Sequence, residues 1–170
     1  CAENDGEILW PDLLDLATPM VRRRLEIAGD GWIRGRRGEL VAEATGETLK
    51  LRCKRSSEDF IAEMRAVLQP IFDARDTNPL GDYWRHLDTE GIRRLSVSDF
   101  VTIGSHGAHH TSLGAIDARA AVTEIERSKA HLEAAIDSEI VDLAYPDGSY
   151  TRPLVEAAAE LGFSAQYAVN

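Results

Sequence analysis

Two periodicities of apolar and polar positions alternate along the second half of the chain. Short apolar runs at 100–103, 140–144 and 163–169 are typical of buried strands. Between them, residues 117–137 and 152–162 repeat apolar positions every three or four residues, which is typical of helices with one buried face. The order strand, helix, strand, helix, strand predicts an α/β fold whose parallel strands are joined by right-handed crossovers.

The first half has another pattern. Apolar positions from Ile8 to Leu25 recur at helical spacing and predict a helix that is interrupted near Pro19. Glycine-containing turn clusters then separate short alternating runs over residues 25–54, which predicts a small meander of strands. This meander is expected to be an insertion in the main fold.

Helix-start signals follow the meander. Ser56 or Ser57 can cap a helix that runs toward Pro70, and residues 73–87 are expected to form a long connection. A further helix is expected to begin at Asp88 or Thr89.

Composition narrows the classes of function. The chain has 170 residues and a formal net charge of -10, which argues against nucleic acid as a partner because phosphates require a basic surface. Cys1 and Cys53 are too few for a disulfide framework or a cysteine-based zinc motif. No apolar window has the length of a transmembrane segment. Oligomeric state stays open, and so does location, with the cytoplasm slightly favoured over export.

The most distinctive stretch is "VTIGSHGAHHTSL" at 101–113, which carries His106, His109 and His110. It follows a predicted strand, and ligand chemistry in parallel α/β folds gathers after the carboxyl ends of strands. Imidazoles three or four residues apart can face one metal ion. The bare spacing leaves metal binding and a polar hydrogen-bonding loop equally open.

Three motifs in order resemble those of the NodB-like polysaccharide deacetylases, the carbohydrate esterase family 4 enzymes. They are Ile-Gly-Ser-His at 103–106 with a second histidine at 110, the stretch "EIERSKAHLE" at 124–133, and "LAYPDG" at 143–148. The resemblance covers the chain in order and is most specific over 88–168.

This resemblance implies part of a distorted (β/α) barrel that hydrolyses N-acetyl groups of amino sugars, or O-acetyl groups of other glycans. One divalent ion, zinc first, would be held by His106 and His110, with His109 in place of His110 as the alternative. Residues 1–170 would form one incomplete domain, in which 1–87 hold a helix, the inserted meander and a further helix, and 88–170 hold the strand and helix units.

The second loop also receives roles from the resemblance. The main-chain N–H of Asp147 would stabilise an oxyanion, and Tyr145 and Pro146 would contact the substrate. A plain Pro-Asp-Gly turn explains the same residues without chemistry.

Two parts of the family pattern are missing from the sequence. No Thr-Phe-Asp-Asp motif is present to supply the catalytic base and a third metal ligand, and Asp5-Gly6 is rejected as its remnant. The general-acid histidine would lie after Asn170. The chain alone is therefore expected to hydrolyse little substrate.

Two other interpretations stay open. One is a carbohydrate-binding or scaffold module without catalysis. The other is a different metallohydrolase, in which Asp82 or Asp88 would complete the site. Several other polar and aromatic residues are given structural roles: His131, Glu124 and Glu126 on a solvated helix surface, and Trp10 and Trp32 in the core.

Overall fold

The computed structural model describes residues 8–74 and 86–169. The chain divides into two compact units. The amino-terminal unit consists of the described residues within 8–85, and the carboxyl-terminal unit of those within 86–170.

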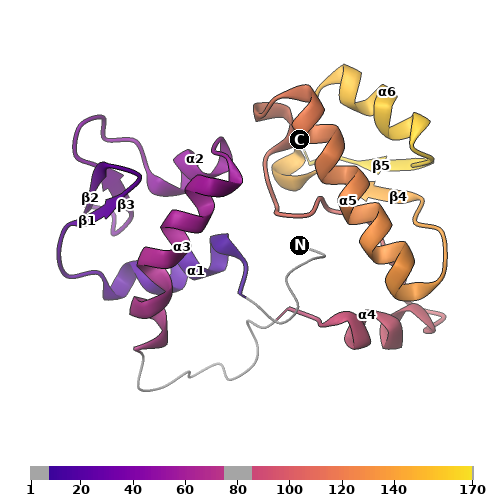
Figure 1. Cartoon of the computed structure of the whole chain (residues 1–170), viewed down its shortest axis with the longest axis horizontal. Coiled ribbons are helices and arrows are strands. Elements are labelled where there is room, and N and C mark those ends of the chain that lie inside the picture. The colour runs from indigo at the N-terminus through magenta and orange to yellow at the C-terminus, as the bar shows by residue number, and fades with distance from the viewer. Residues whose placement is uncertain (1–7, 75–85, 170) are drawn as a thin grey trace. The chain divides into compact units, whose positions relative to one another are not determined.

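The amino-terminal unit joins three helices to a small antiparallel sheet (Figure 1). Its elements are α1 (Trp10–Ala17), the 3-10 turn η1 (Thr18–Met20), β1 (Leu25–Ile27), β2 (Asp30–Arg34), β3 (Leu40–Ala42), α2 (Leu49–Lys54) and α3 (Glu58–Asp73). The predicted interruption of the first helix is confirmed, since the α-helix ends before Pro19. The meander is confirmed over β1–β3, but its expected continuation at 49–54 is helix α2.

One tryptophan organises the core of this unit. Trp32 lies on the central strand β2, pairs with Leu25 on β1 and Ala42 on β3, and is 0% exposed. Its ring meets Phe60 of α3 edge to face, with centroids 6.5 Å apart. Trp10 is also buried in this cluster, so the prediction that both tryptophans belong to the core is confirmed.

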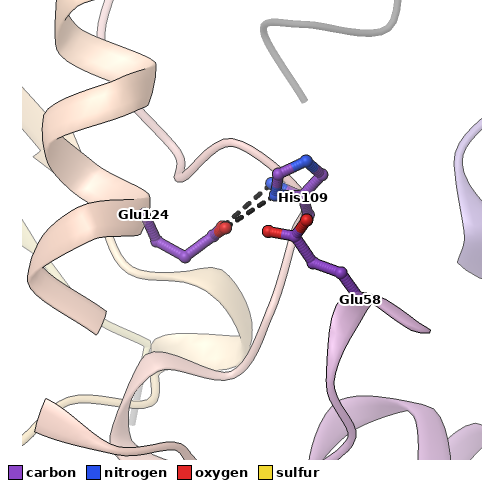
Figure 2. Close-up of side chains that lie close together, drawn as sticks. All are labelled: Glu58, His109 and Glu124. Carbon is purple, nitrogen blue, oxygen red and sulfur yellow. Dashed lines mark hydrogen bonds and ion pairs between the residues drawn. The ribbon is translucent and has the colours of Figure 1, made fainter. Parts of the chain in front are cut away.

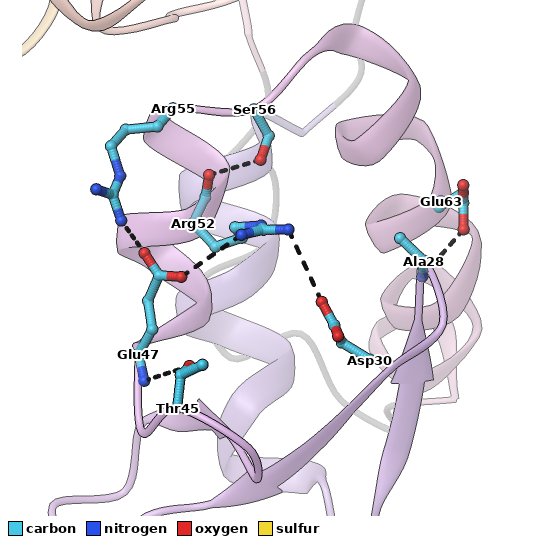
Figure 3. Close-up of polar contacts among 8 residues, drawn as sticks. All are labelled: Ala28, Asp30, Thr45, Glu47, Arg52, Arg55, Ser56 and Glu63. Carbon is cyan, nitrogen blue, oxygen red and sulfur yellow. Dashed lines mark hydrogen bonds and ion pairs between the residues drawn. The ribbon is translucent and has the colours of Figure 1, made fainter.

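Polar contacts connect the meander to its helices (Figure 3). Arg52 of α2 lies 3.8 Å from both Asp30 and Glu47, and Arg55 also pairs with Glu47. Ala28, at the β1–β2 turn, donates its main-chain N–H to Glu63 of α3 at 3.0 Å. These exposed pairs add little stability each, and the apolar core carries the unit.

The carboxyl-terminal unit is an alternation of helices and parallel strands (Figure 1). Its elements are α4 (Thr89–Ser96), η3 (Leu113–Ala115), α5 (Ala118–Ile136), β4 (Asp142–Ala144), η4 (Pro146–Gly148), α6 (Arg152–Glu160) and β5 (Ala165–Tyr167). The predicted parallel pairing is confirmed, since Leu143 of β4 lies opposite Gln166 of β5. Helices α5 and α6 contribute Ile125 and Leu154 to the core beside these strands.

Capping residues set the bounds of two helices. The Asp88 side chain accepts from the N–H of Gly91 at the start of α4, and the Asp117 side chain accepts from two N–H groups at the start of α5. Helix α5 ends at Asp137, which adopts the left-handed conformation with φ 53°. Both predicted helix starts are confirmed.

The predicted buried strand at 100–103 is wrong. Phe100 is 97% exposed, and the N–H of Val101 closes a turn onto Ser98. Pairing with the sheet is limited to Ser105, which forms an isolated parallel bridge with Leu143. The apolar run therefore starts in the turn after α4, and only its end reaches the sheet.

The α/β class is confirmed for the described residues. In the carboxyl-terminal unit, the described residues form two paired parallel strands and one further parallel bridge, and they do not close a barrel. None of the described helices combines the length and the apolar character needed to cross a membrane.

Candidate functional site

The histidine loop, residues 106–110, follows the Ser105 bridge and turns sharply. Gly107 has φ 73° and His110 has φ 59°, both in the left-handed region. The turn brings the rings of His106 and His110 together, with centroids 4.9 Å apart and planes at 77°. The two histidines that the sequence singled out therefore face each other.

One ring nitrogen of His106 is held by the backbone. Nδ1 lies 2.8 Å from the carbonyl oxygen of Ala144, at the end of β4. A carbonyl only accepts hydrogen bonds, so Nδ1 carries a proton; in the neutral form of the ring, Nε2 then keeps its lone pair. Histidine ligands of metals in proteins are typically oriented in this way, by a hydrogen bond from the ring nitrogen that does not bind the metal.

The second histidine has an unsatisfied nitrogen. Nδ1 of His110 is buried and has no hydrogen-bond partner among the described residues. Burial, followed by the nearby His106, lowers the pKa of His110 below its ordinary value. His110 is therefore neutral near pH 7, which is the form that binds metals.

His109 points to a different partner (Figure 2). Its Nδ1 lies 2.6 Å from Oε1 of Glu124 in α5, and its main-chain N–H donates to Oε2 of the same carboxylate at 2.9 Å. Burial alone would raise the pKa of Glu124, but the two hydrogen bonds from His109 outweigh burial and lower it. Both carboxylate oxygens are thereby engaged with one residue.

The expectation that Glu124 lies on the solvated face of its helix is wrong, because its exposed fraction is 6%. The helical pattern counted only apolar positions as buried, whereas a buried carboxylate is tolerated when it is hydrogen-bonded. Ser128, one turn later, is also buried. The one sequence signal for the burial of Glu124 was its position one helical turn before Ser128, within the motif at 124–133.

The rest of that motif connects α5 to the strands. The buried hydroxyl of Ser105 donates a hydrogen bond to the hydroxyl of Ser128 at 2.9 Å. Glu133 accepts from the N–H of Ile140 at 3.0 Å and pairs with Lys129, which donates to the carbonyl oxygen of Ile140. The motif thus holds the helix against the histidine loop and against the segment that enters β4.

The turn at 145–148 follows β4. Asp147 has φ 55°, and its Oδ2 accepts from the hydroxyl of Ser112 at 2.6 Å. Gly148 has φ 66°, and a Cβ there would collide with the backbone of Val169, so only glycine fits. The expected Pro-Asp-Gly turn is confirmed.

Tyr145 and Pro146 are both buried. The Tyr145 hydroxyl contacts Gln166, and its ring lies 5.3 Å from the ring of Tyr150. These contacts give Tyr145 a packing role in the turn, as burial does for Pro146. The predicted contact of both residues with substrate stays a prediction.

A groove of about 310 Å³ lies beside His106. Asp142 and Ala144 of β4 line it, together with Tyr167 of β5, whose hydroxyl donates to Asp142 at 2.8 Å. The small side chain at Ala144 leaves this space open next to the imidazole.

No aspartate, glutamate or cysteine within 8–74 and 86–169 joins His106 and His110 in a three-ligand cluster. The Asp88 side chain caps α4. Asp82 and the rejected Asp5-Gly6 lie outside the described residues. His131 is partly buried, and Glu126 is exposed as expected.

The lowered pKa of Glu124 predicts a pH-dependent contribution to stability. A carboxyl whose pKa is lowered on folding stabilises fully above its ordinary value of 4.5, and this contribution is lost as pH falls through the lower folded pKa. We expect Glu124→Gln to cost about 1.5–3 kcal/mol near pH 7, and the difference from wild type to shrink below pH 4.5. Urea unfolding of both proteins from neutral pH to below pH 4.5 measures this difference in the free energy of unfolding.

The matched control is Glu126→Gln, on the exposed side of the same helix. It should leave stability unchanged at every pH. A Glu124→Gln difference that stays constant from neutral to acidic pH would contradict the assignment.

The carboxyl-terminal unit therefore carries a histidine loop and a Tyr-Pro-Asp-Gly turn at the ends of adjacent parallel segments. The polysaccharide deacetylase family model matches residues 62–166, which is more than half of the chain. The chain belongs to the polysaccharide deacetylase family, and the resemblance inferred from its motifs is confirmed.

Solved structures provide a second comparison. The deacetylase PplD of Streptococcus pyogenes in complex with acetate is 20% identical, with a TM-score of 0.48 over 63% of this chain and 51% of that one. A pseudoenzyme of carbohydrate esterase family 4 from Bacillus anthracis is 15% identical, with a TM-score of 0.43 over 46% of this chain and 27% of that one. The chain thus spans about half or less of these proteins. No curated protein matches it.

Proposed function

We propose that this chain provides the metal-binding histidines of a glycan deacetylase, which removes acetyl groups from N-acetylated amino sugars or from O-acetylated glycans. Family membership supports the reaction class. The observation that carries the proposal is the pair His106 and His110, whose rings face each other with centroids 4.9 Å apart.

The donor set fits one divalent ion, zinc first. His106 offers Nε2 because Nδ1 is held by Ala144, and His110 has a buried Nδ1 without a partner. Two neutral imidazoles suit zinc better than a hard cation such as magnesium. The ion would polarise the acetyl carbonyl and lower the pKa of a bound water.

The chain's own contribution to the reaction lies in the turn after β4. The carboxylate of Asp147 accepts a hydrogen bond from the hydroxyl of Ser112. It also lies near enough to His110 to raise the pKa of that imidazole, against the larger lowering by burial. We propose that the main-chain N–H of Asp147 stabilises the oxyanion of the tetrahedral intermediate. Tyr145 and Pro146, the buried first two residues of this turn, would hold it in place and border the sugar.

The fold of the family supports a further part of the proposal. The parallel strands β4 and β5 and the bridge at Ser105 would be consecutive segments of a distorted (β/α) barrel. The groove beside His106 would then open toward the acetylated sugar.

Acetate release tests this proposal. The natural open reading frame that contains the chain is expressed, loaded with zinc, and incubated with N-acetylated and O-acetylated oligosaccharides. We expect release of acetate from one of the two classes, and loss of the release in the variant with both His106→Ala and His110→Ala. Release that persists in the double variant would contradict the proposal.

A second candidate is a scaffold module that binds glycan without hydrolysis. It is favoured by one observation, that no carboxylate in the described parts of the chain completes the histidine pair. Oligosaccharide binding without acetate release, at saturating zinc, is the result that this candidate predicts.

A further inference from the structure

The carboxylate of Glu124 sits against the inner side of the histidine loop. Its Oε2 accepts from the main-chain N–H of His109, and its Oε1 contacts His109 Nδ1 (Figure 2). A Cβ placed on Gly107 would lie 3.5 Å from Oε2, so the carboxylate also lies beside Gly107. One side chain of α5 therefore lies against the loop at both Gly107 and His109.

This loop needs an external support for its shape. His110 has φ 59°, a conformation that a residue with a side chain adopts only when its surroundings determine it. The residue directly before it, His109, is the one that Glu124 holds by both backbone and ring. The carboxylate therefore acts where the backbone turns the His110 ring toward His106.

Helix α5 secures the loop at two points. Ser128 contacts Ser105, the residue before His106, and Glu124 binds His109, the residue before His110. Each histidine of the facing pair is thus preceded by a residue that α5 fixes. Glu124 and Ser128 lie one helical turn apart, so a single rigid element sets the spacing of the two rings.

We propose that Glu124 is a positioning residue, which acts through His109 to hold His106 and His110 in the arrangement that binds one metal ion. This inference rests on the proposed function, because it assumes that the two histidines bind the ion. Groups that orient metal ligands typically change metal affinity by about 10–100-fold when they are removed.

The test measures zinc affinity by competition with a chromophoric chelator. We expect Glu124→Ala to weaken zinc binding by about 10–100-fold. Glu124→Gln should restore part of the affinity, because its amide oxygen can still accept from the N–H of His109. Glu126→Ala, on the exposed side of the same helix, should bind zinc as the wild type does.

His109→Ala identifies the path of the effect. It removes the ring contact, so it should weaken zinc binding less than Glu124→Ala does. The double variant with both substitutions should be no weaker than Glu124→Ala alone, since both changes break the same connection. Fully additive losses would overturn the proposal.

A metal-free measurement separates this proposal from the proposed function. Amide hydrogen exchange should show a protected His109 N–H in the wild type and an unprotected one in Glu124→Ala, with α5 still protected in both. If His106 and His110 bind zinc and Glu124→Ala keeps the wild-type affinity, the positioning role is overturned and the proposed function stands. If the His109 N–H behaves as expected and the wild type takes up no zinc, the proposed function fails, and the positioning role with it.

General unfolding gives a different pattern. Loss of protection along all of α5 in both Glu124→Ala and Glu124→Gln, with equal loss of zinc affinity, would mean that Glu124 maintains the fold. That result overturns the positioning role.

Discussion

Replacing either His106 or His110 by alanine should abolish specific zinc uptake. Each substitution removes one of two facing imidazoles, so the loss of affinity should exceed the roughly 100-fold upper range seen when a group that only orients a ligand is lost. Native mass spectrometry of the zinc-loaded chain measures the uptake, and competition with a chelator measures the affinity.

His131→Ala and His109→Ala are the controls for this prediction. His131 lies on α5 about two helical turns after Glu124 and is not part of the histidine loop, so its loss should leave zinc uptake unchanged. His109→Ala should weaken binding without abolishing it. Zinc uptake that depended on His109 and survived the loss of His110 would instead assign the second ligand to His109, the alternative that the sequence left open.

Leu143→Ala should destabilise the carboxyl-terminal unit by about 2–5 kcal/mol, because truncating a buried leucine removes apolar contacts and leaves a cavity. Leu143 is 0% exposed, pairs with Gln166 on β5, and forms the bridge to Ser105 that begins the histidine loop. Amide exchange in α5 measures the loss within this unit, independently of the amino-terminal unit.

The same substitution at an exposed site is the matched control. Leu87 is 55% exposed, so Leu87→Ala should change stability by less than about 0.5 kcal/mol. An unchanged exchange rate in α5 of Leu143→Ala would contradict the assignment of Leu143 to the core.

Elements with strong local signals could be predicted from the sequence. The long apolar stripe over 117–137 predicted α5, and the alternation of runs predicted the parallel pairing of β4 and β5. These features depend on neighbours in sequence, which a single chain displays directly.

Features that depend on distant contacts could not be predicted in this way. The run at 100–103 is apolar enough for a buried strand, yet Phe100 is exposed because the backbone turns there. Apolar and polar residues alternate over 49–54 as they would in a strand. The segment is instead a helix with Thr48 as its N-cap, and the helix buries Leu49 and Cys53 in the core. Tertiary packing decided both segments.

The candidate site shows the same division. The motifs selected His106 and His110, and the structure brings their rings together. The use of His109 could not be read from spacing, because its partner Glu124 lies fifteen positions further along the chain. A buried acid on a helix looks like a surface acid in a sequence until its hydrogen-bond partner is known.

The most direct test of the central claim is a crystal of the chain soaked in zinc, with anomalous diffraction recorded at the zinc absorption edge. We predict one strong peak between His106 and His110, at about 2.0–2.1 Å from a ring nitrogen of each. Two results would contradict the assignment of these two histidines as the metal ligands. One is a peak at His109 and Glu124 instead; the other is no peak between the facing rings in a crystal that has bound zinc at other positions.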